Sequence, residues 1–91
     1  MLEIVLSNRF KKDLKIAKKR GYNLDLLNDV VEKLAMQEPL PKKNRDHSLT
    51  GDFIGFRECH IQPDWLLVYR VNDEELILFL TRTGTHSDLF D

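Results

Sequence analysis

The fold is decided by residues 53–83, which read FIGFRECHIQPDWLLVYRVNDEELILFLTRT. This stretch holds three runs rich in β-branched, aromatic and other apolar residues, and a turn-forming tripeptide separates each run from the next. The runs are about Phe53–Ile61, Trp65–Val71 and Glu75–Thr83, and the turns are Gln62-Pro63-Asp64 and Asn72-Asp73-Glu74. Strands joined by turns this short pair antiparallel, so the sequence predicts a three-stranded antiparallel sheet.

The residues before this sheet predict one further strand and two helices. The alternation over residues 2–6 is typical of a short strand. Apolar residues then recur at helical spacing over residues 8–20, where Ser7 can cap the first turn and Gly21 ends the helix. Asn23 can cap a second helix, whose apolar stripe is Leu27, Val30, Val31, Leu34 and Ala35. Residues 38–52 read as a loop and residues 87–91 as a short tail.

The order of elements defines the expected architecture. Two helices joined by a short connection form a hairpin, and they bury their apolar stripes by packing on one face of the sheet. The sequence therefore predicts a single α+β domain over residues 1–91, with two layers and the order β-α-α-β-β-β. The helical hairpin covers one face of a mostly antiparallel sheet, and the other face or an edge stays open for a site.

Length and composition exclude several classes of protein. A chain of 91 residues is enough for one domain, and its single cysteine cannot form an internal disulfide. The longest apolar run, residues 76–80, is far shorter than the roughly 20 residues that span a bilayer. These features predict a cytoplasmic protein with no membrane partner.

The net charge of -1 conceals a strong local asymmetry. Residues 9–20 carry seven cationic side chains and one acidic side chain, and a second basic group lies at Lys42, Lys43 and Arg45. Such a field can attract phosphates or an acidic protein. The alternative interpretation is a solvated helix face without a binding role.

All three histidines, His47, His60 and His86, lie in the second half of the chain. Histidine can take and give protons near neutral pH. By the strand period of two, Glu58 shares a face with His60 and could orient its imidazole. Cleavage of RNA by its own 2′-hydroxyl needs a base, an acid and a cation, and two histidines with Arg82 supply all three without a metal. Each histidine could instead be structural.

The remaining candidates have structural alternatives as well. Trp65 and Phe90 could stack on bases, or Trp65 could belong to the core and Phe90 could dock the tail. The histidines are 13 and 26 residues apart and form no metal-binding motif, so no metal or cofactor is expected, although a three-histidine zinc site is the alternative. Cys59 reads as an inert strand residue.

Three segments occur in the order and spacing of a known family. They are Asp46-His47-x-Leu49-x-Gly51, Phe56-Arg57-Glu58-Cys59-His60-Ile61-x-Pro63-Asp64-Trp65-x-x-Val68-Tyr69, and Arg82-Thr83-Gly84-Thr85-His86-x-x-Leu89-Phe90. With the order of elements, these residues resemble the YafQ branch of the RelE/ParE toxin superfamily over nearly the whole chain. The resemblance implies a RelE-like fold and a type II toxin that enters the ribosomal A site and cuts translated mRNA as an endoribonuclease.

The resemblance also implies site residues. The family's active-site positions match His47, His60, Asp64, Trp65, Arg82, His86 and Phe90. We expect His86 and His60 to be the proton-transfer pair, His47 to assist at the phosphate, and Arg82 to hold the scissile phosphate. Asp64 would orient a histidine or a base edge. Glu58 stands where the family commonly has aspartate. Lys11, Lys12 and Lys15 would dock on ribosomal RNA.

The implied partners are an antitoxin encoded beside the toxin, the ribosome and its mRNA, and operator DNA through the antitoxin complex alone. Two other functions remain open at this point. One scaffold can host different activities, so the chain could be a ParE-like toxin that binds DNA gyrase without nuclease activity. It could also be an RNA-binding relative that has no catalytic function.

Overall fold

The computed structural model describes residues 1–90 and contains one five-stranded sheet in the order β1-β5-β4-β3-β2. Strand β1 pairs parallel with β5, and every other neighbouring pair is antiparallel. The elements in chain order are β1 (Glu3–Leu6), α1 (Asn8–Lys19), α2 (Leu24–Ala35), the 3₁₀ turn η1 (Lys42–Asn44), β2 (His47–Ser48), the 3₁₀ turn η2 (Gly51–Phe53), β3 (Arg57–Gln62), β4 (Trp65–Asn72), β5 (Ile77–Gly84) and α3 (His86–Phe90).

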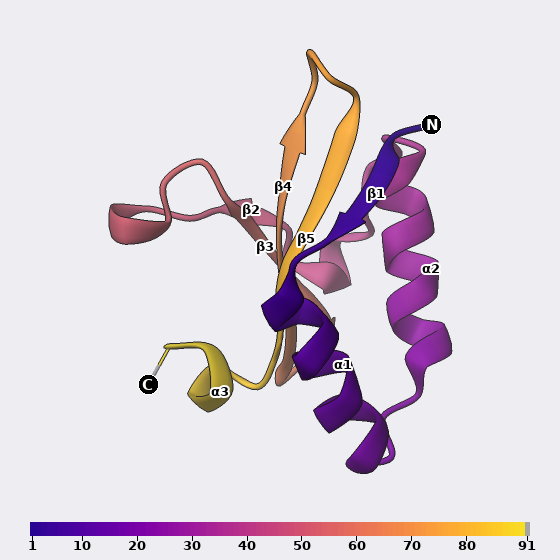
Figure 1. Cartoon of the computed structure of the whole chain (residues 1–91), viewed down its shortest axis with the longest axis vertical. Helices are drawn as coiled ribbons and strands as arrows, with labels where there is room; N and C mark the ends of the chain where they lie inside the picture. Colours follow the sequence, from indigo (N-terminus) through magenta and orange to yellow (C-terminus); the bar gives the residue numbers. More distant parts are fainter. Residues whose placement is uncertain (91) are drawn as a thin grey trace.

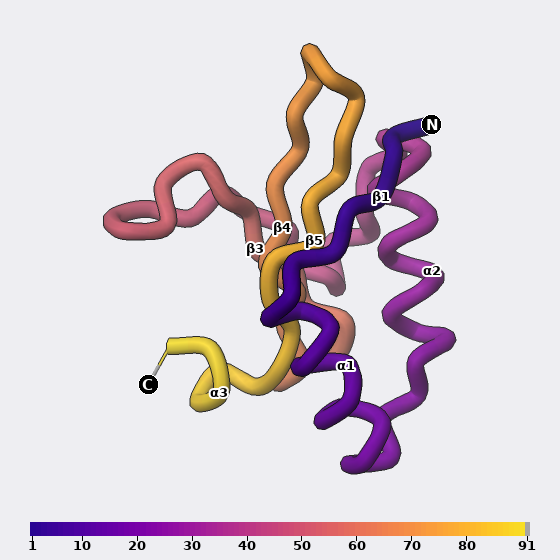
Figure 2. The backbone as a smooth tube through the Cα atoms, viewed as in Figure 1, coloured from indigo at the N-terminus to yellow at the C-terminus, as the bar shows by residue number. Residues whose placement is uncertain are grey.

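The two long helices cover one side of the sheet. Figure 1 shows α1 and α2 on that side, and it shows α3 and the segment between β2 and β3 on the other. The tube in Figure 2 shows the chain starting beside the end of α2, where the Leu2 N–H donates to the Ala35 carbonyl at 2.8 Å. The expected two-layer α+β architecture is confirmed. No helix within residues 1–90 is long and apolar enough to cross a membrane.

The helices begin where their caps predict. The Ser7 side chain accepts from the Phe10 N–H at 2.9 Å, and the Asn23 side chain accepts from the Asp25 N–H at 3.0 Å. Both bonds satisfy amides that the first helical turn leaves without partners. The helices then bury Phe10 and Ala17 of α1 and Leu27, Val30, Leu34 and Ala35 of α2 against the sheet. Each large apolar side chain contributes about 1.5–3 kcal/mol by burial.

Strand β4 lies at the centre of the sheet and is buried on both faces. Trp65, Leu67 and Tyr69 belong to the core cluster beneath the helices. Leu66 and Val68 alternate with them and are 0% and 2% exposed, on the side where α3 and the β2–β3 segment lie. The second face is therefore only partly open. It is the face that carries His47, Glu58, His60 and Arg82 among the candidate residues.

The structure corrects three predicted boundaries. Strand β3 begins at Arg57 rather than Phe53, because η2 and Gly55, with φ +93°, turn the chain before it. The expected loop contains the two-residue strand β2, too short to leave a periodic signal. The expected tail forms α3, and Asp91 lies outside the described residues.

Helix α3 forms because Thr85 and Asp88 make a reciprocal cap. The Thr85 hydroxyl accepts from the Asp88 N–H at 3.1 Å, and the Asp88 carboxylate accepts from the Thr85 N–H at 2.9 Å. This is the geometry of a capping box, with an aspartate in place of the usual glutamate. The cap fixes the direction in which the chain leaves β5.

Candidate functional site

The sheet register places three candidate residues in one row. His47 pairs with Glu58, Glu58 with Val68, and Val68 with Arg82. Directly paired residues project from the same face, and adjacent strands lie about 4.8 Å apart. The row therefore crosses four strands on the face opposite α1 and α2.

A second row runs beside the first. His60 pairs with Leu66, and Leu66 pairs with Gly84. His60 therefore shares its face with Glu58, as the strand period predicts. Helix α3 starts two residues after Gly84, at His86. All three histidines thus belong to the partly open side of the sheet.

His47 is held by two oxygen atoms. Its Nδ1 lies 2.7 Å from the Arg45 carbonyl oxygen, and its Nε2 lies 3.0 Å from Glu58 Oε2. Only the imidazolium form can donate to both acceptors. The His47 side chain is 50% exposed, so the ring remains accessible to a substrate.

Glu58 is a buried carboxylate, which corrects two predictions. Its side chain is 6% exposed, so it does not face RNA, and it contacts His47 rather than orienting His60. Its Oε1 atom has no hydrogen-bond partner within residues 1–90. A buried, half-satisfied carboxylate is costly to maintain, and the His47 ring is the side chain that contacts it, 3.0 Å from Oε2.

His60 is fixed through its ring and its main chain. Its Nδ1 lies 3.1 Å from the Pro63 carbonyl oxygen, which requires the proton on Nδ1 and leaves Nε2 for a substrate. The buried amide of Asn44 donates to the His60 carbonyl oxygen at 2.7 Å. Asn44 thus ties the basic loop before β2 to the strand that carries His60.

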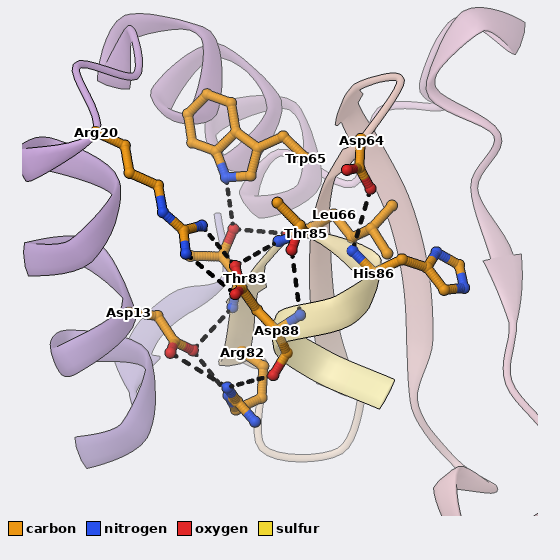
Figure 3. Close-up of polar contacts among 10 residues, drawn as sticks. All are labelled: Asp13, Arg20, Asp64, Trp65, Leu66, Arg82, Thr83, Thr85, His86 and Asp88. Atoms are coloured by element: carbon orange, nitrogen blue, oxygen red, sulfur yellow. Dashed lines mark hydrogen bonds and ion pairs between the residues drawn. The ribbon is translucent and has the colours of Figure 1, made fainter. Parts of the chain in front are cut away.

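His86 is exposed at the start of α3, and its ring points away from α1 (Figure 3). Its ring centroid lies 5.3 Å from that of Phe90, and Phe90 makes an edge contact with Phe53 at 5.5 Å. Asp64 does not contact the imidazole. Its carboxylate accepts from the His86 main-chain N–H at 3.1 Å, so it orients the residue through the backbone.

Phe53 is a further candidate for the site, and its sequence pattern does not indicate this. The pattern predicts a strand at Phe53, whereas the residue lies in η2 and is 40% exposed. The available signal was its position between two glycines, Gly51 and Gly55, both of which have positive φ. Glycine at such positions permits a sharp turn, which presents the aromatic ring to the C-terminal helix.

Arg82 is turned toward α1 by Asp13, a partner that the sequence analysis did not identify. Arg82 Nε and Nη2 donate to the two Asp13 carboxylate oxygens at 2.8 and 3.3 Å (Figure 3). Asp13 also accepts from the Thr83 N–H at 3.1 Å. Strand β1 ends its pairing at Leu80, so Asp13 satisfies an amide on the edge of β5 that has no strand neighbour.

The Arg82 guanidinium and the His60 imidazole share a face but line different pockets. Arg82 lines a pocket of about 270 Å³ between α1 and the end of β5, and His60 lines another of about 390 Å³ beside Lys43 and Arg45. Neither of these two pockets is lined by His47 or His86. A single cleft that joins the three imidazoles to Arg82 stays a prediction.

Trp65 belongs to the core, which corrects its prediction as a base-stacking residue. It is 1% exposed, its ring packs 4.8 Å from that of Tyr22, and its Nε1 donates to Thr83 Oγ1 at 2.9 Å. The Thr83 hydroxyl in turn donates to the Leu66 carbonyl at 2.6 Å. A ring this deeply buried cannot reach a nucleotide, and the structural alternative holds.

The predicted lysines differ in their relation to Arg82. Lys11, Lys12 and Lys15 are all exposed, but only Lys12 lines the pocket that contains Arg82. At 100° per residue, Lys15 projects about 60° from Lys12 and Lys11 about 100° from it, so both point to the same flank of the helix. Within residues 1–90, no three His, Cys, Asp or Glu side chains are grouped to hold a metal ion.

Comparisons with known proteins agree with this architecture. The sequence model of the family described as "Bacterial toxin of type II toxin-antitoxin system, YafQ" matches residues 2–91. The mRNA interferase toxin YafQ of Escherichia coli strain K12 is 38% identical over 89 residues, covering 97% of this chain and 95% of that protein.

Two crystal structures are similar over the same length. A metal-bound toxin from Helicobacter pylori has a TM-score of 0.94 and 52% identity, covering 99% of this chain and 100% of that one. The toxin in the Escherichia coli DinJ-YafQ toxin-antitoxin complex has a TM-score of 0.89 and 37% identity, covering 99% of this chain and 98% of that one. Because the family model spans nearly every residue, the chain belongs to the YafQ family of bacterial toxins of type II toxin–antitoxin systems.

Proposed function

We propose that this toxin is an mRNA interferase, an endoribonuclease that cuts mRNA through attack of the 2′-hydroxyl on the adjacent phosphate. The observation that carries the proposal is the register of β2, β3, β4 and β5. It aligns His47, Glu58 and Arg82 in one row and His60 in the next, on the side of the sheet where His86 begins α3.

The reaction needs proton transfer at two oxygens and stabilisation of the phosphorane charge. His86 and His60 are the proton-transfer pair, because His86 is exposed and the Nε2 of His60 is not engaged by its contact with Pro63. His47 assists at the phosphate through its half-exposed ring. Arg82 has two nitrogens bound to Asp13, so its Nη1 hydrogens are those left for a phosphate oxygen.

Aromatic rings shape the nucleotide site in this proposal. Phe90 contacts both His86 and Phe53, so the three rings form a continuous surface that could hold a base. Stacking on such a surface contributes about 1–3 kcal/mol per base.

The proposed partners are the translating ribosome with its mRNA, and an antitoxin. The exposed lysines of α1 give the toxin a cationic surface for ribosomal RNA, where phosphate contacts dominate affinity. The Escherichia coli relative forms a complex with the antitoxin DinJ, and we propose a corresponding antitoxin for this chain. Contact with operator DNA would occur through that complex.

The test compares wild-type toxin with His86→Gln on mRNA in a translating extract, with primer extension to locate new 5′ ends. Wild type is expected to cut, and His86→Gln to lose at least about 100-fold in rate, with the same denaturation midpoint. The same proteins are assayed for inhibition of gyrase supercoiling. Intact mRNA together with inhibited supercoiling would refute the nuclease, and equal cutting by both proteins would refute the role of His86.

A further inference from the structure

The pocket between α1 and the end of β5 is lined by more cations than anions. Arg9, Lys12, Arg20 and Arg82 contribute four positive charges, and Asp13 and Asp88 contribute two negative charges. Its volume of about 270 Å³ lies below the roughly 300–1,000 Å³ of sites for drug-sized ligands. The pocket suits a small anionic group better than a whole nucleotide.

Both carboxylates in the pocket are already engaged. Asp13 accepts two bonds from Arg82 and one from the Thr83 N–H. Asp88 accepts from Arg20 at 2.6 and 3.1 Å and from the Thr85 N–H at 2.9 Å (Figure 3). The arginines are held in place by these bonds.

The two other cations have no such partner. Within residues 1–90, neither Arg9 nor Lys12 forms an ion pair, and both are exposed. With the two arginine–aspartate pairs neutral, Arg9 and Lys12 leave the pocket with an excess charge of two. Arginine and lysine side chains are the groups that proteins use to bind phosphate, and this pocket has two of them without an ion-pair partner within residues 1–90.

We propose that this pocket is a second phosphate subsite, which binds a backbone phosphate of RNA beside the cleavage site. The inference rests on the proposed nuclease function and deepens it. Arg9 and Lys12 are the cations of this subsite, whereas Arg82 lies at the pocket wall and keeps its Nη1 for the scissile phosphate. The ring of His86 lies on the other side of α3 from Asp88 (Figure 3). The phosphate bound by Arg9 and Lys12 is therefore a neighbour of the scissile phosphate in the same strand, or a phosphate of ribosomal RNA.

Helix α1 itself provides the matched control. Arg9, Lys12 and Arg20 follow one another at spacings of three and eight residues, which keeps them near one face of a helix. Lys18 and Lys19 lie in the last turn and do not line the pocket. Arg9→Ala/Lys12→Ala and Lys18→Ala/Lys19→Ala therefore remove the same charge from the same helix, and neither breaks an ion pair within residues 1–90.

The first arm measures binding without cleavage. Each of the two double substitutions is introduced into His86→Gln toxin. The affinity for a 2′-deoxy oligonucleotide is then measured by fluorescence anisotropy across a salt series. Each phosphate contact contributes a slope of about 0.7 in log affinity against log salt for single strands. We expect Arg9→Ala/Lys12→Ala to reduce the slope by about 0.7, because one phosphate contact is lost, and Lys18→Ala/Lys19→Ala to change it little.

The second arm measures binding of the same proteins to purified ribosomes. Loss of oligonucleotide affinity in the Arg9/Lys12 variant assigns the subsite to the cleaved strand, and loss of ribosome affinity alone assigns it to ribosomal RNA. The proposal would be overturned if both double variants lost the same affinity, or if Arg9→Ala/Lys12→Ala lost affinity for neither the oligonucleotide nor the ribosome. Weakened binding of the antitoxin with unchanged RNA binding would also overturn it, because the pocket would then receive an acidic peptide. Cleavage by wild type is scored separately, so failure of the nuclease function would be recognised independently.

Discussion

Asp13 holds Arg82 across 69 residues of sequence, with Arg82 Nε 2.8 Å from a carboxylate oxygen that also accepts from the Thr83 N–H. The contact joins the first helix to the end of the last strand. Asp13 is 6% exposed and the Arg82 side chain 23% exposed, so water competes weakly for the bonds. Asp13 thus fixes both the edge of the sheet and the direction of the guanidinium.

Asp13→Asn is expected to reduce the free energy of unfolding by about 1–3 kcal/mol, because an amide cannot accept all three bonds and leaves a buried donor unpaired. Arg82→Met should reduce the free energy of unfolding less in the Asp13→Asn variant than in the wild-type protein. Urea unfolding of the two single variants and the double variant measures the coupling. Additive effects would show that the pair contributes nothing beyond its separate contacts.

The order and type of the main elements were predictable because local patterns determine them. Ser7 and Asn23 stand directly before the helices that they cap. The apolar residues of α1 and α2 recur at helical spacing. Both signals depend on residues that are close in the sequence, so the sequence reveals them. The pairing of consecutive strands follows from short turns. The parallel pairing of β1 with β5 needs the helical hairpin as a crossover, and no local pattern specifies it.

The site was less predictable, because its contacts are long-range. Glu58 was assigned to His60 from a spacing of two residues, but the register of β2 brings His47 opposite it. Asp13 appeared as one acidic residue in a basic helix, and nothing in the sequence pairs it with Arg82. Trp65 was ambiguous because an aromatic residue at a strand start fits both a core and a binding surface.

His47→Ala is expected to destabilise the protein, because it leaves the buried Glu58 carboxylate without the ring nitrogen that lies 3.0 Å from its Oε2. The unfolding free energy should fall by about 1–3 kcal/mol. Glu58→Gln removes the charge, so His47→Ala should have a smaller effect in that background. Denaturant unfolding of all four proteins gives the coupling energy. Equal effects of His47→Ala in both backgrounds would show that the ring does not compensate the carboxylate.

Trp65→Phe is expected to lower stability without changing RNA affinity. The variant loses the bond from Nε1 to Thr83 Oγ1, worth roughly 0.5–1.5 kcal/mol, and part of the buried area. Trp65 is the single tryptophan, so its fluorescence reports on the core. Emission should shift to longer wavelength on unfolding and stay constant when the 2′-deoxy oligonucleotide binds. Quenching by the oligonucleotide would restore the stacking role.

Phe53→Ala is expected to slow cleavage, because Phe90 loses the edge contact that supports its ring beside His86. Such an aromatic pair is worth about 0.5–1.5 kcal/mol, so the single-turnover rate should fall by up to roughly tenfold. Ile54→Ala is the control, because it removes a neighbouring side chain that is 78% exposed. A comparable loss of rate in both variants would indicate a general effect of the loop.

Asp88→Asn is expected to change how stability depends on pH. The Arg20 guanidinium, helped by the Thr85 N–H, holds the pKa of Asp88 well below its ordinary value of 3.8. A depressed pKa means that the folded state favours the carboxylate. The stabilisation is therefore present above the unfolded pKa and lost as the pH falls through the folded pKa.

Urea unfolding from about pH 7 to about pH 2.5 should show wild type and Asp88→Asn converging below about pH 4. Asp73→Asn, in an exposed turn, corrects for general titration. A constant difference between wild type and Asp88→Asn across the series would mean that the ion pair does not anchor α3 to α1.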